Sequence, residues 1–255
     1  MPFVTVNAQR LEYEWFCLPP AACPPIVLLH EGLGSLAMWK DFPHQVAQAT
    51  GHRVLGYSRL GYGRSDPLRG PRPVRYMHDE ALHTLPCLLD ALQIERPVLL
   101  GHSDGGSIAL IYAGGTGRPV AGLILMAPHV MVEDISVASI AAARTAYQTT
   151  DLRDRLARYH ADVDGAFWGW NEVWLRPEFR TWNIEAYLPA ITCPVLAIQG
   201  EDDPYGTMAQ IERIAQQVRG PVELLRLPGC GHSPHRDQPQ AVLAAIARFM
   251  ARLAC

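Results

Sequence analysis

The sequence predicts an α/β protein in which helices cover both faces of a mostly parallel sheet. Short continuous apolar runs, such as 26–29 and 98–100, are typical of strands that are buried on both faces. Stretches with apolar residues at a period near 3.6, such as 76–92, lie between these runs and are typical of helices. Strands that alternate with helices favour a parallel sheet, because each parallel connection must cross over the sheet.

The elements follow one another in a regular order. Two alternating segments, 3–6 and 11–16, flank turn residues and predict a hairpin. The expected elements after it are a strand at 26–29, a helix at 38–50, a strand at 53–57, a helix at 76–92, a strand at 98–100, a helix at 107–113 and a strand at 122–126. The alternation resumes with a strand at 194–198, a helix at 206–218, a strand at 222–227 and a helix at 239–253.

Between residues 130 and 190 this alternation stops. The segment has a helix-like pattern, no strand signal and a concentration of aromatic residues. We therefore expect residues 1–129 and 191–255 to form one core, with 130–190 inserted as a helical layer. The aromatic residues are Phe167, Trp168, Trp170, Trp174, Phe179, Trp182 and Tyr187.

Length and composition exclude several classes of protein. A chain of 255 residues with 49% hydrophobic and 18% charged residues is typical of a single soluble α/β enzyme. A net charge of −3 without a Lys/Arg cluster predicts no nucleic-acid partner. No apolar run approaches the ~18 residues of a membrane span, and no signal peptide is visible. The six cysteines lack metal-ligand spacing, so we expect free thiols, no metal and a cytoplasmic location.

The stretch Gly101-His102-Ser103-Asp104-Gly105 lies between an expected strand and an expected helix. A Gly-x-Ser-x-Gly motif in that context predicts a nucleophile elbow, a sharp turn that presents the serine hydroxyl above the sheet. Glycines on either side of the serine allow neighbouring backbone to pass close to the turn. The positive end of the following helix dipole faces the point where negative charge would develop in a reaction.

A serine hydroxyl becomes a nucleophile when a base removes its proton, and that base needs an orienting carboxylate. His232 follows a glycine just after the expected strand 222–227, where open α/β sheets place functional residues. We therefore predict that His232 is the base that serves Ser103. His235, three residues further on, is expected to be solvated.

The acid is expected on the loop after the strand 194–198. Asp203 is the preferred residue, while spacing alone leaves Asp202 and Glu201 as alternatives. An oxyanion requires two preorganised donors. The backbone N–H of Asp104 is one candidate, and the loop after strand 26–29 offers Gly32 or its neighbour Leu33 as the other.

At this point the chain resembles the α/β-hydrolase superfamily over nearly its whole length. The motifs that carry the resemblance are Leu29-His30-Glu31-Gly32, Gly61-Tyr62-Gly63-Arg64-Ser65, Gly101-His102-Ser103-Asp104-Gly105-Gly106, Gly200-Glu201-Asp202-Asp203 and Gly229-Cys230-Gly231-His232. The resemblance implies an α/β-hydrolase fold with a mostly parallel eight-stranded sheet and a helical cap between strands 6 and 7. It also implies that Asp203 is the acid, because the superfamily places this residue three positions after the strand-end glycine.

By the same resemblance, aromatic residues of the cap would wall a substrate pocket, with Trp168 and Trp170 as candidates. The Gly-x-Ser-Asp-Gly-Gly arrangement and residues 132–136 resemble the valacyclovir hydrolase-like amino-acid esterases. That family implies that Asp104 binds an amine on the acyl part of the substrate. The alternative is that Asp104 accepts hydrogen bonds at the start of its own helix. Glu31 stands where the superfamily usually has glycine, and it is expected either to contact substrate or to pair with Arg59 or another arginine.

These features favour a serine hydrolase that cleaves a small carboxylic ester through an acyl-enzyme, with an ester of α-amino-acid type as the narrower candidate. A carbon–carbon bond hydrolase, a thioesterase, an amidase and an acyltransferase of the same fold remain alternatives. A ligand-binding protein without turnover and a cofactor-free perhydrolase are more remote ones. We expect no cofactor, because the loop at 61–65 lacks the P-loop lysine. The expected partner is a small ester-like molecule, without nucleic acid or membrane, for a monomer or homodimer.

Overall fold

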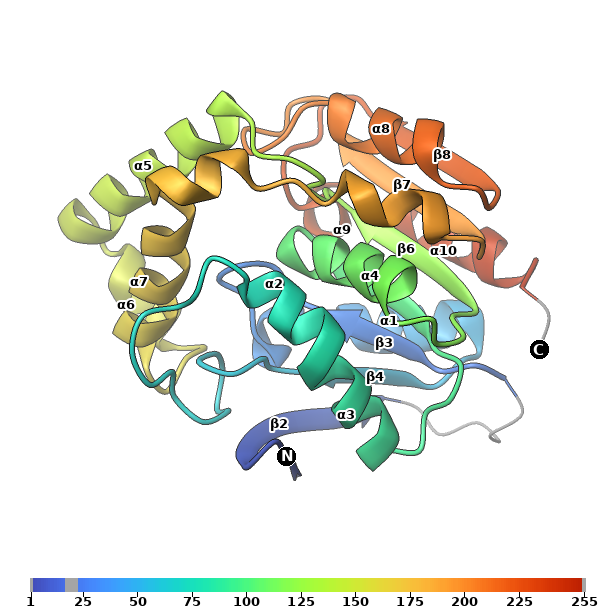
Figure 1. The fold of residues 1–255 in the computed structure, drawn as a ribbon, viewed down its shortest axis with the longest axis horizontal. Coiled ribbons are helices and arrows are strands. Elements are labelled where there is room, and N and C mark those ends of the chain that lie inside the picture. Colours follow the sequence, from blue (N-terminus) through green and yellow to red (C-terminus); the bar gives the residue numbers. More distant parts are fainter. Residues whose placement is uncertain (1, 17–22, 254–255) are drawn as a thin grey trace.

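The computed structural model describes residues 2–16 and 23–253, and its sheet runs through the centre of the molecule (Figure 1). Eight strands form one sheet in the order β1-β2-β4-β3-β5-β6-β7-β8. β1 and β2 form the expected hairpin and β2 is antiparallel to β4, whereas all later neighbours are parallel. The mostly parallel eight-stranded sheet is thus confirmed. The strands are β1 (Phe3–Val6), β2 (Gln9–Phe16), β3 (Ile26–Leu29), β4 (Val54–Tyr57), β5 (Val98–His102), β6 (Gly122–Met126), β7 (Val195–Gly200) and β8 (Val222–Leu227).

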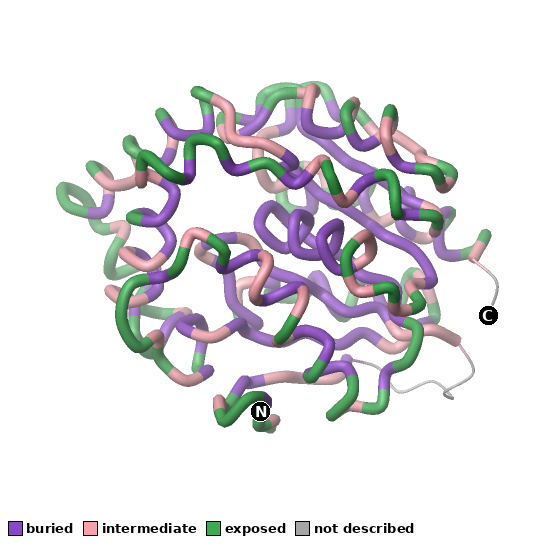
Figure 2. The backbone as a smooth tube through the Cα atoms, in the orientation of Figure 1, coloured by how far each residue is buried: buried purple, intermediate pink, exposed green. Residues whose placement is uncertain are grey.

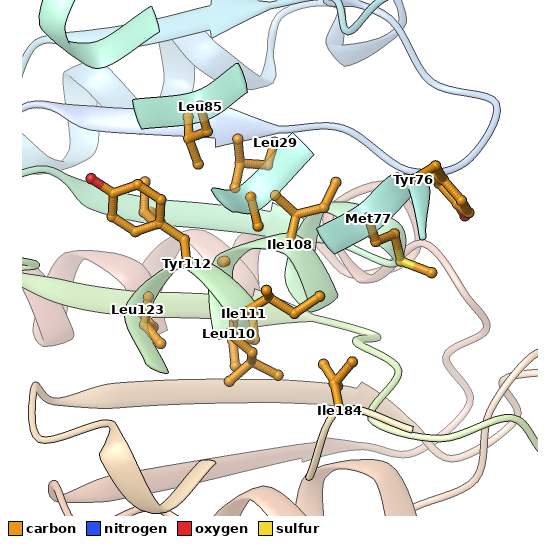
Figure 3. Close-up of a cluster of buried hydrophobic side chains, with 14 of the residues drawn as sticks. Leu29, Tyr76, Met77, Leu85, Ile108, Leu110, Ile111, Tyr112, Leu123 and Ile184 are labelled. Carbon is orange, nitrogen blue, oxygen red and sulfur yellow. The ribbon is translucent and has the colours of Figure 1, made fainter. Parts of the chain in front are cut away.

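Alternate residues of the central strands enter two separate hydrophobic cores. On β3, Val27 and Leu29 face one core, whereas Ile26 and Leu28 face the other. The first core includes α3 (Leu85–Ala91), α4 (Asp104–Gly115) and α8 (Ala209–Gln217), and Figure 3 shows a part of it. The second core includes α1 (Phe42–Thr50) and α10 (Pro239–Met250). Burial on both faces explains why these strands read as continuous apolar runs.

Two expected helices are interrupted. The one expected at 38–50 consists of a 3₁₀ turn, Leu36–Trp39, and then α1, because Lys40 between them has a positive φ of 52°. The one expected at 76–92 consists of α2 (Tyr76–Asp79), a π-helical turn (Glu80–Thr84) and α3. The short α9 (Pro234–Asp237) precedes α10 and was not expected.

The segment between β6 and β7 contains helices and lies beside the carboxyl ends of the strands (Figure 1). Its described backbone forms no strand, only an isolated bridge between Met131 and Asn183. Buried residues line its inner side and exposed residues its outer side in Figure 2. Its elements are α5 (Asp134–Thr149), α6 (Leu152–Ala157), α7 (Val163–Trp174) and the 3₁₀ helices Pro177–Thr181 and Glu185–Ala190.

The expectation that every cysteine is a free thiol is wrong at Cys23. Cys87, Cys193 and Cys230 are free, but Cys23 is disulfide-bonded. Scattered spacing gave no sign of this bond, because a disulfide depends on proximity in the fold rather than in the sequence. Within the described residues, the helices are too short or too polar to cross a membrane.

Candidate active site

Ser103 occupies the strained turn between β5 and α4. Its φ of 53° and ψ of −118° lie in a region that residues other than glycine rarely adopt. A Cβ at Gly101 would lie 2.3 Å from the Gly105 carbonyl oxygen, and one at Gly105 would lie 1.9 Å from the Leu29 carbonyl oxygen. Both glycines of the motif are therefore required by close backbone contacts, and together they allow the serine to stand at the apex.

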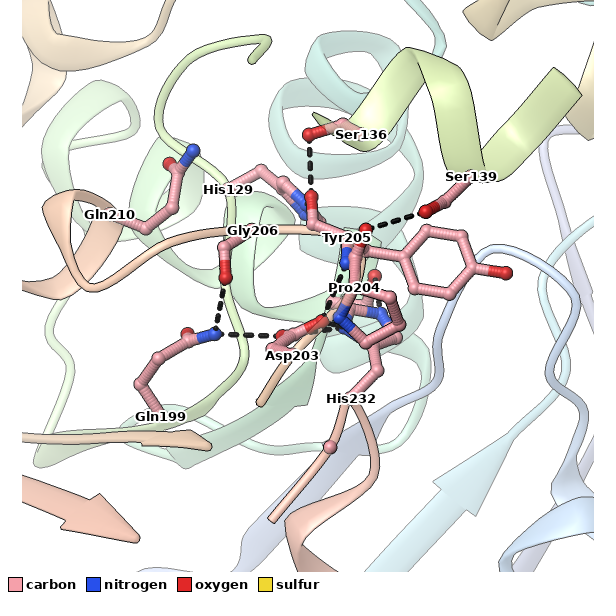
Figure 4. Close-up of polar contacts among 12 residues, drawn as sticks. His129, Ser136, Ser139, Gln199, Asp203, Pro204, Tyr205, Gly206, Gln210 and His232 are labelled. Atoms are coloured by element: carbon pink, nitrogen blue, oxygen red, sulfur yellow. Dashed lines mark hydrogen bonds and ion pairs between the residues drawn. The ribbon is translucent and has the colours of Figure 1, made fainter. Parts of the chain in front are cut away.

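The structure brings His232 and Asp203 to Ser103 from two different loops. His232 Nε2 lies 3.0 Å from Ser103 Oγ, and His232 Nδ1 lies 2.8 Å from Asp203 Oδ2 (Figure 4). Because a carboxylate only accepts, the proton sits on Nδ1. Nε2 is then free to accept the proton of the serine hydroxyl, which is the arrangement that nucleophilic catalysis requires.

Asp203 is the carboxylate that the fold places against His232, whereas Asp202 and Glu201 are exposed at the turn. Its carboxylate also accepts hydrogen bonds from Gln199 Nε2 at 2.7 Å and from the Tyr205 backbone N–H at 2.8 Å. Burial alone would raise the pKa of Asp203. Its hydrogen bonds and the neighbouring His232 outweigh that effect and lower the pKa, so the carboxylate stays ionised.

His232 is held in its neutral form by its surroundings. Burial lowers the pKa of His232, and the contact with Asp203 offsets that shift only in part. Nearby His102 and His129 lower the pKa further. A neutral imidazole is the form that acts as a general base.

A cavity of about 220 Å³ opens directly above Ser103. Gly32 and Asp104 line this cavity, and the backbone N–H of neither has a hydrogen-bond partner among the described residues. A Cβ at position 32 would lie 2.2 Å from Trp170 Nε1, so this position accommodates only glycine. The cavity is lined by Glu31, Gly32, Leu33, Ser103, Asp104, His129, Ile140, Trp170, Trp174, Tyr205, His232 and Ser233.

Glu31 pairs with an arginine other than Arg59. Its carboxylate lies 3.5 Å from Arg236 Nη2 and 3.4 Å from His102 Nδ1. Burial opposes ionisation, but His102 and Arg236 together hold the pKa of Glu31 well below its usual range. His102 Nε2 donates at 2.7 Å to the backbone oxygen of His232, so this histidine links the elbow to the loop of the base.

The expectation that His235 is solvated is wrong. The residue is 5% exposed and packs against Trp39, Phe42 and His102. Burial lowers its pKa to about 2, so the ring is neutral. The sequence did not indicate this, because the burial of His235 depends on the short helix α9, which was not expected.

The side chain of Asp104 contacts residues outside its own helix. Oδ2 accepts a hydrogen bond of 2.5 Å from the Tyr76 hydroxyl and lies 3.8 Å from Arg59 Nη1. Trp174 Nε1 donates to the same Tyr76 hydroxyl at 2.9 Å. Oδ1 is buried without a hydrogen-bond partner among the described residues. The side chain therefore makes no capping hydrogen bond to α4, which was the alternative expected from the sequence.

Sequence reasoning did not identify Tyr76, Arg59 or His129 as parts of the site. Each lies on a loop or helix that no motif marks as functional, apart from Arg59, which directly precedes the glycine-rich stretch from Gly61. His129 lies just past β6, and that position at a strand end was the one available signal.

The two candidate tryptophans lie in different surroundings. Trp170 lines the cavity, together with Trp174, which lies one helical turn further along α7. Trp168 does not line it and instead packs against Tyr147 and Phe167, at ring distances of 5.5 Å and 5.1 Å. The i, i+4 spacing of 170 and 174 puts both on one face, which position 168 does not share. No group of three His, Cys, Asp or Glu within the described ranges could hold a metal ion.

The fold and the site together define a hydrolytic enzyme. The model of the alpha/beta hydrolase family matches residues 26–245, and the chain belongs to this family. A proline iminopeptidase of Lactobacillus helveticus is 24% identical over 89% of this chain and 90% of its own length. Esterase YbfF of Escherichia coli is 27% identical over 89% of this chain and 92% of its own length. The crystal structure of an enol-lactonase from Burkholderia xenovorans superposes with a TM-score of 0.77 at 24% identity, covering 98% and 100% of the two chains.

Proposed function

We propose that this enzyme hydrolyses a small carboxylic ester through an acyl-enzyme formed on Ser103. The observation that carries the proposal is the unbroken chain of contacts from Ser103 Oγ to His232, at 3.0 Å, and from His232 to Asp203, at 2.8 Å. This series of contacts ends at a cavity lined by two residues, Gly32 and Asp104, whose backbone N–H groups have no partner among the described residues. Its members come from loops far apart in the sequence, so their convergence is a property of the fold.

The geometry supports a two-step reaction. Ser103 Oγ attacks the ester carbonyl carbon while its proton passes to His232 Nε2. The Gly32 and Asp104 N–H groups bind the negative oxygen of the tetrahedral intermediate. The intermediate collapses with cleavage of the carbon–oxygen bond, and the alcohol leaves with the proton from His232. Water, deprotonated by His232, then attacks the acyl carbon, and Ser103 leaves with that proton.

The cavity supports a small acyl group. Its volume of about 220 Å³ lies below the usual range for drug-sized ligands, ~300–1,000 Å³. Ile140, Trp170 and Trp174 form apolar parts of its wall. A small cavity with such a wall favours a short apolar chain over a long or branched one.

One observation favours an ester of α-amino-acid type as a second, narrower candidate. Two acidic residues, Glu31 and Asp104, are among the residues that line the cavity, and its lining includes no lysine or arginine. Asp104 Oδ1 is a buried acceptor without a hydrogen-bond partner among the described residues, and a substrate ammonium group that reached it would supply the missing donor. Arg59, behind Asp104, compensates part of that charge. A relative named proline iminopeptidase is in keeping with an amine next to the cleaved bond.

A matched pair of substrates tests both proposals. p-Nitrophenyl propionate and p-nitrophenyl alaninate differ in the α-ammonium group. They would be compared with wild type, Ser103→Ala, Glu31→Gln and Asp104→Asn. Loss of both activities in Ser103→Ala supports the acyl-enzyme. A selective loss of the alaninate in Asp104→Asn or Glu31→Gln supports amine recognition, and equal losses on both esters would remove it. Undiminished turnover in Ser103→Ala would refute the proposed nucleophile.

A further inference from the structure

We propose that Arg59 is a positioning residue of the oxyanion hole. Its guanidinium contacts both segments that carry the proposed donors, the Gly32 N–H and the Asp104 N–H. It binds the peptide group that carries the Gly32 N–H, and it attracts the side chain of the residue that carries the Asp104 N–H. The inference rests on the proposed function, since an oxyanion forms only if Ser103 attacks an acyl carbonyl. Arg59 follows β4 and is 1% exposed, so it acts from behind the site without touching the substrate.

The first side of the hole is fixed through the backbone oxygen of Glu31. Arg59 Nη2 donates to this oxygen at 2.8 Å, and His30 Nδ1 lies 2.7 Å from it. The Arg59 backbone N–H donates to His30 Nε2 at 3.1 Å, so Nε2 carries the lone pair and Nδ1 carries the hydrogen. Two buried donors thus converge on one carbonyl. The 3.4 Å approach of Arg59 Nη2 to His30 Nδ1 is a contact between these two donors.

Fixing that oxygen also fixes the direction of the oxyanion donor. The Glu31 carbonyl and the Gly32 N–H belong to one planar trans peptide group and point in opposite directions. With its oxygen end bound by Arg59 and His30, the N–H end is directed away from them. Gly32 lines the cavity beside Ser103, and its N–H has no partner among the described residues.

The second side is fixed through charge. Arg59 Nη1 lies 3.8 Å from Asp104 Oδ2, and both side chains are at most 2% exposed. Nη1 makes no hydrogen bond within the described chain, so electrostatic attraction holds this side. The buried guanidinium of Arg59 and the buried carboxylate of Asp104 compensate each other, because either charge alone would be costly to bury. Asp104 begins α4 directly after Ser103, so the pair ties the elbow to the loop of Gly32.

Arg72 provides a matched control from the same surroundings. It is 6% exposed, and its guanidinium lies 4.6 Å from the Tyr62 ring, over which Arg59 lies at 5.0 Å. Its hydrogen bond goes to the Leu60 backbone oxygen at 3.2 Å. Arg72→Met therefore removes a buried guanidinium next to the same ring and leaves the bonds to the Glu31 oxygen in place.

The experiment measures kcat and KM on a p-nitrophenyl ester and the Ki of an aryl trifluoromethyl ketone. This ketone forms a tetrahedral adduct with an active serine and requires the oxyanion donors. In Arg59→Met we expect kcat to fall by about 10- to 100-fold, with a parallel loss of ketone affinity and KM within about twofold. Arg72→Met keeps both values near wild type. The double variant Arg59→Met/Asp104→Asn, which removes both charges, keeps the defect because the donor is still misdirected.

Three results would overturn the inference. Equal kcat and Ki in Arg59→Met and Arg72→Met would reduce Arg59 to a packing role. Recovery in the double variant would mean that Arg59 only neutralises Asp104. If circular dichroism shows that Arg59→Met is unfolded, Arg59→Lys takes its place. An ammonium cannot reproduce the branched contact of a guanidinium, so a wild-type kcat in Arg59→Lys would also overturn the inference. Turnover that survives Ser103→Ala would instead refute the proposed function.

Discussion

Two regions face the same cavity and differ in the balance of contacts that holds them. The loops at the carboxyl ends of the strands are fixed by short hydrogen bonds, such as His232 to Asp203 at 2.8 Å and Ser107 Oγ to the His129 oxygen at 2.6 Å. The helical segment between β6 and β7 has hydrogen bonds as well, such as Asn171 Nδ2 to the Ile140 oxygen at 2.8 Å, but it also contains a cluster of packed rings. Tyr147 and Phe167 lie 3.7 Å apart and nearly parallel.

This difference suggests a division of roles, in which the loops carry out catalysis and the helical segment selects the substrate. Hydrogen bonds weaken steeply with small errors in angle, so the loops can keep reacting atoms in register. Packed apolar side chains tolerate changes of shape with a modest loss of stability. Substitutions in the loops should therefore reduce kcat, whereas substitutions in the helical segment should alter KM and substrate choice.

The strongest test of this division is Ser103→Ala. We expect kcat to fall by about 10⁵-fold, because no other group can form the acyl-enzyme. Removal of one hydroxyl in a strained turn should leave the thermal midpoint equal to or above that of wild type. Steady-state rates on a p-nitrophenyl ester and a melting curve provide both values. A variant with substantial activity would mean that the loops do not carry the chemistry.

Asp203→Asn should follow, with kcat reduced by about 10⁴-fold. An amide donates toward His232 Nδ1 and favours the wrong tautomer. Asp202→Asn is the matched control, because the neighbouring side chain is exposed, and its rate should equal that of wild type. If both variants lose activity equally, the acid has been assigned to the wrong residue.

The pH dependence should report His232. Only the neutral imidazole accepts the serine proton, and burial lowers its pKa below the usual value. The value of kcat/KM should therefore stay level as pH falls to about 6.5, and then drop about tenfold per pH unit below the lowered pKa. A profile on an ester with a non-titrating acyl group measures this. An acid limb centred above pH 7 would contradict the direction of the shift.

The smallest effect should come from the helical segment. Trp170→Phe trims a side chain that lines the cavity, and we expect KM to change by about tenfold or less while kcat changes little. Trp168→Phe is the control on the same helix, since this residue packs on Tyr147 away from the cavity. A large loss of kcat in Trp170→Phe would mean that the indole also supports Gly32, and the division between the regions would become less sharp.

Local signals predicted the sheet and the order of the motifs, because strands buried on both faces read directly as apolar runs. They also predicted which residues would meet, since Ser103, Asp203 and His232 each follow a strand whose end lies on one edge of the sheet. The sequence predicted an arginine partner for Glu31 without indicating which arginine, and it did not predict the Tyr76 partner of Asp104. Their contacts with Arg236 and Tyr76 join segments that only tertiary packing brings together, and no periodicity records such pairs.

The hydrogen bond from Trp174 to Tyr76 has a consequence for engineering this enzyme. It joins α7 to Tyr76, whose hydroxyl donates to Asp104 at the base of the elbow. A chimaera that exchanged residues 130–190 for the equivalent stretch of another hydrolase would remove the indole donor. The tyrosine oxygen would lose that donor in a buried place, at a cost of about 1–3 kcal/mol. Exchange of this stretch to obtain a new specificity should therefore retain an indole at position 174.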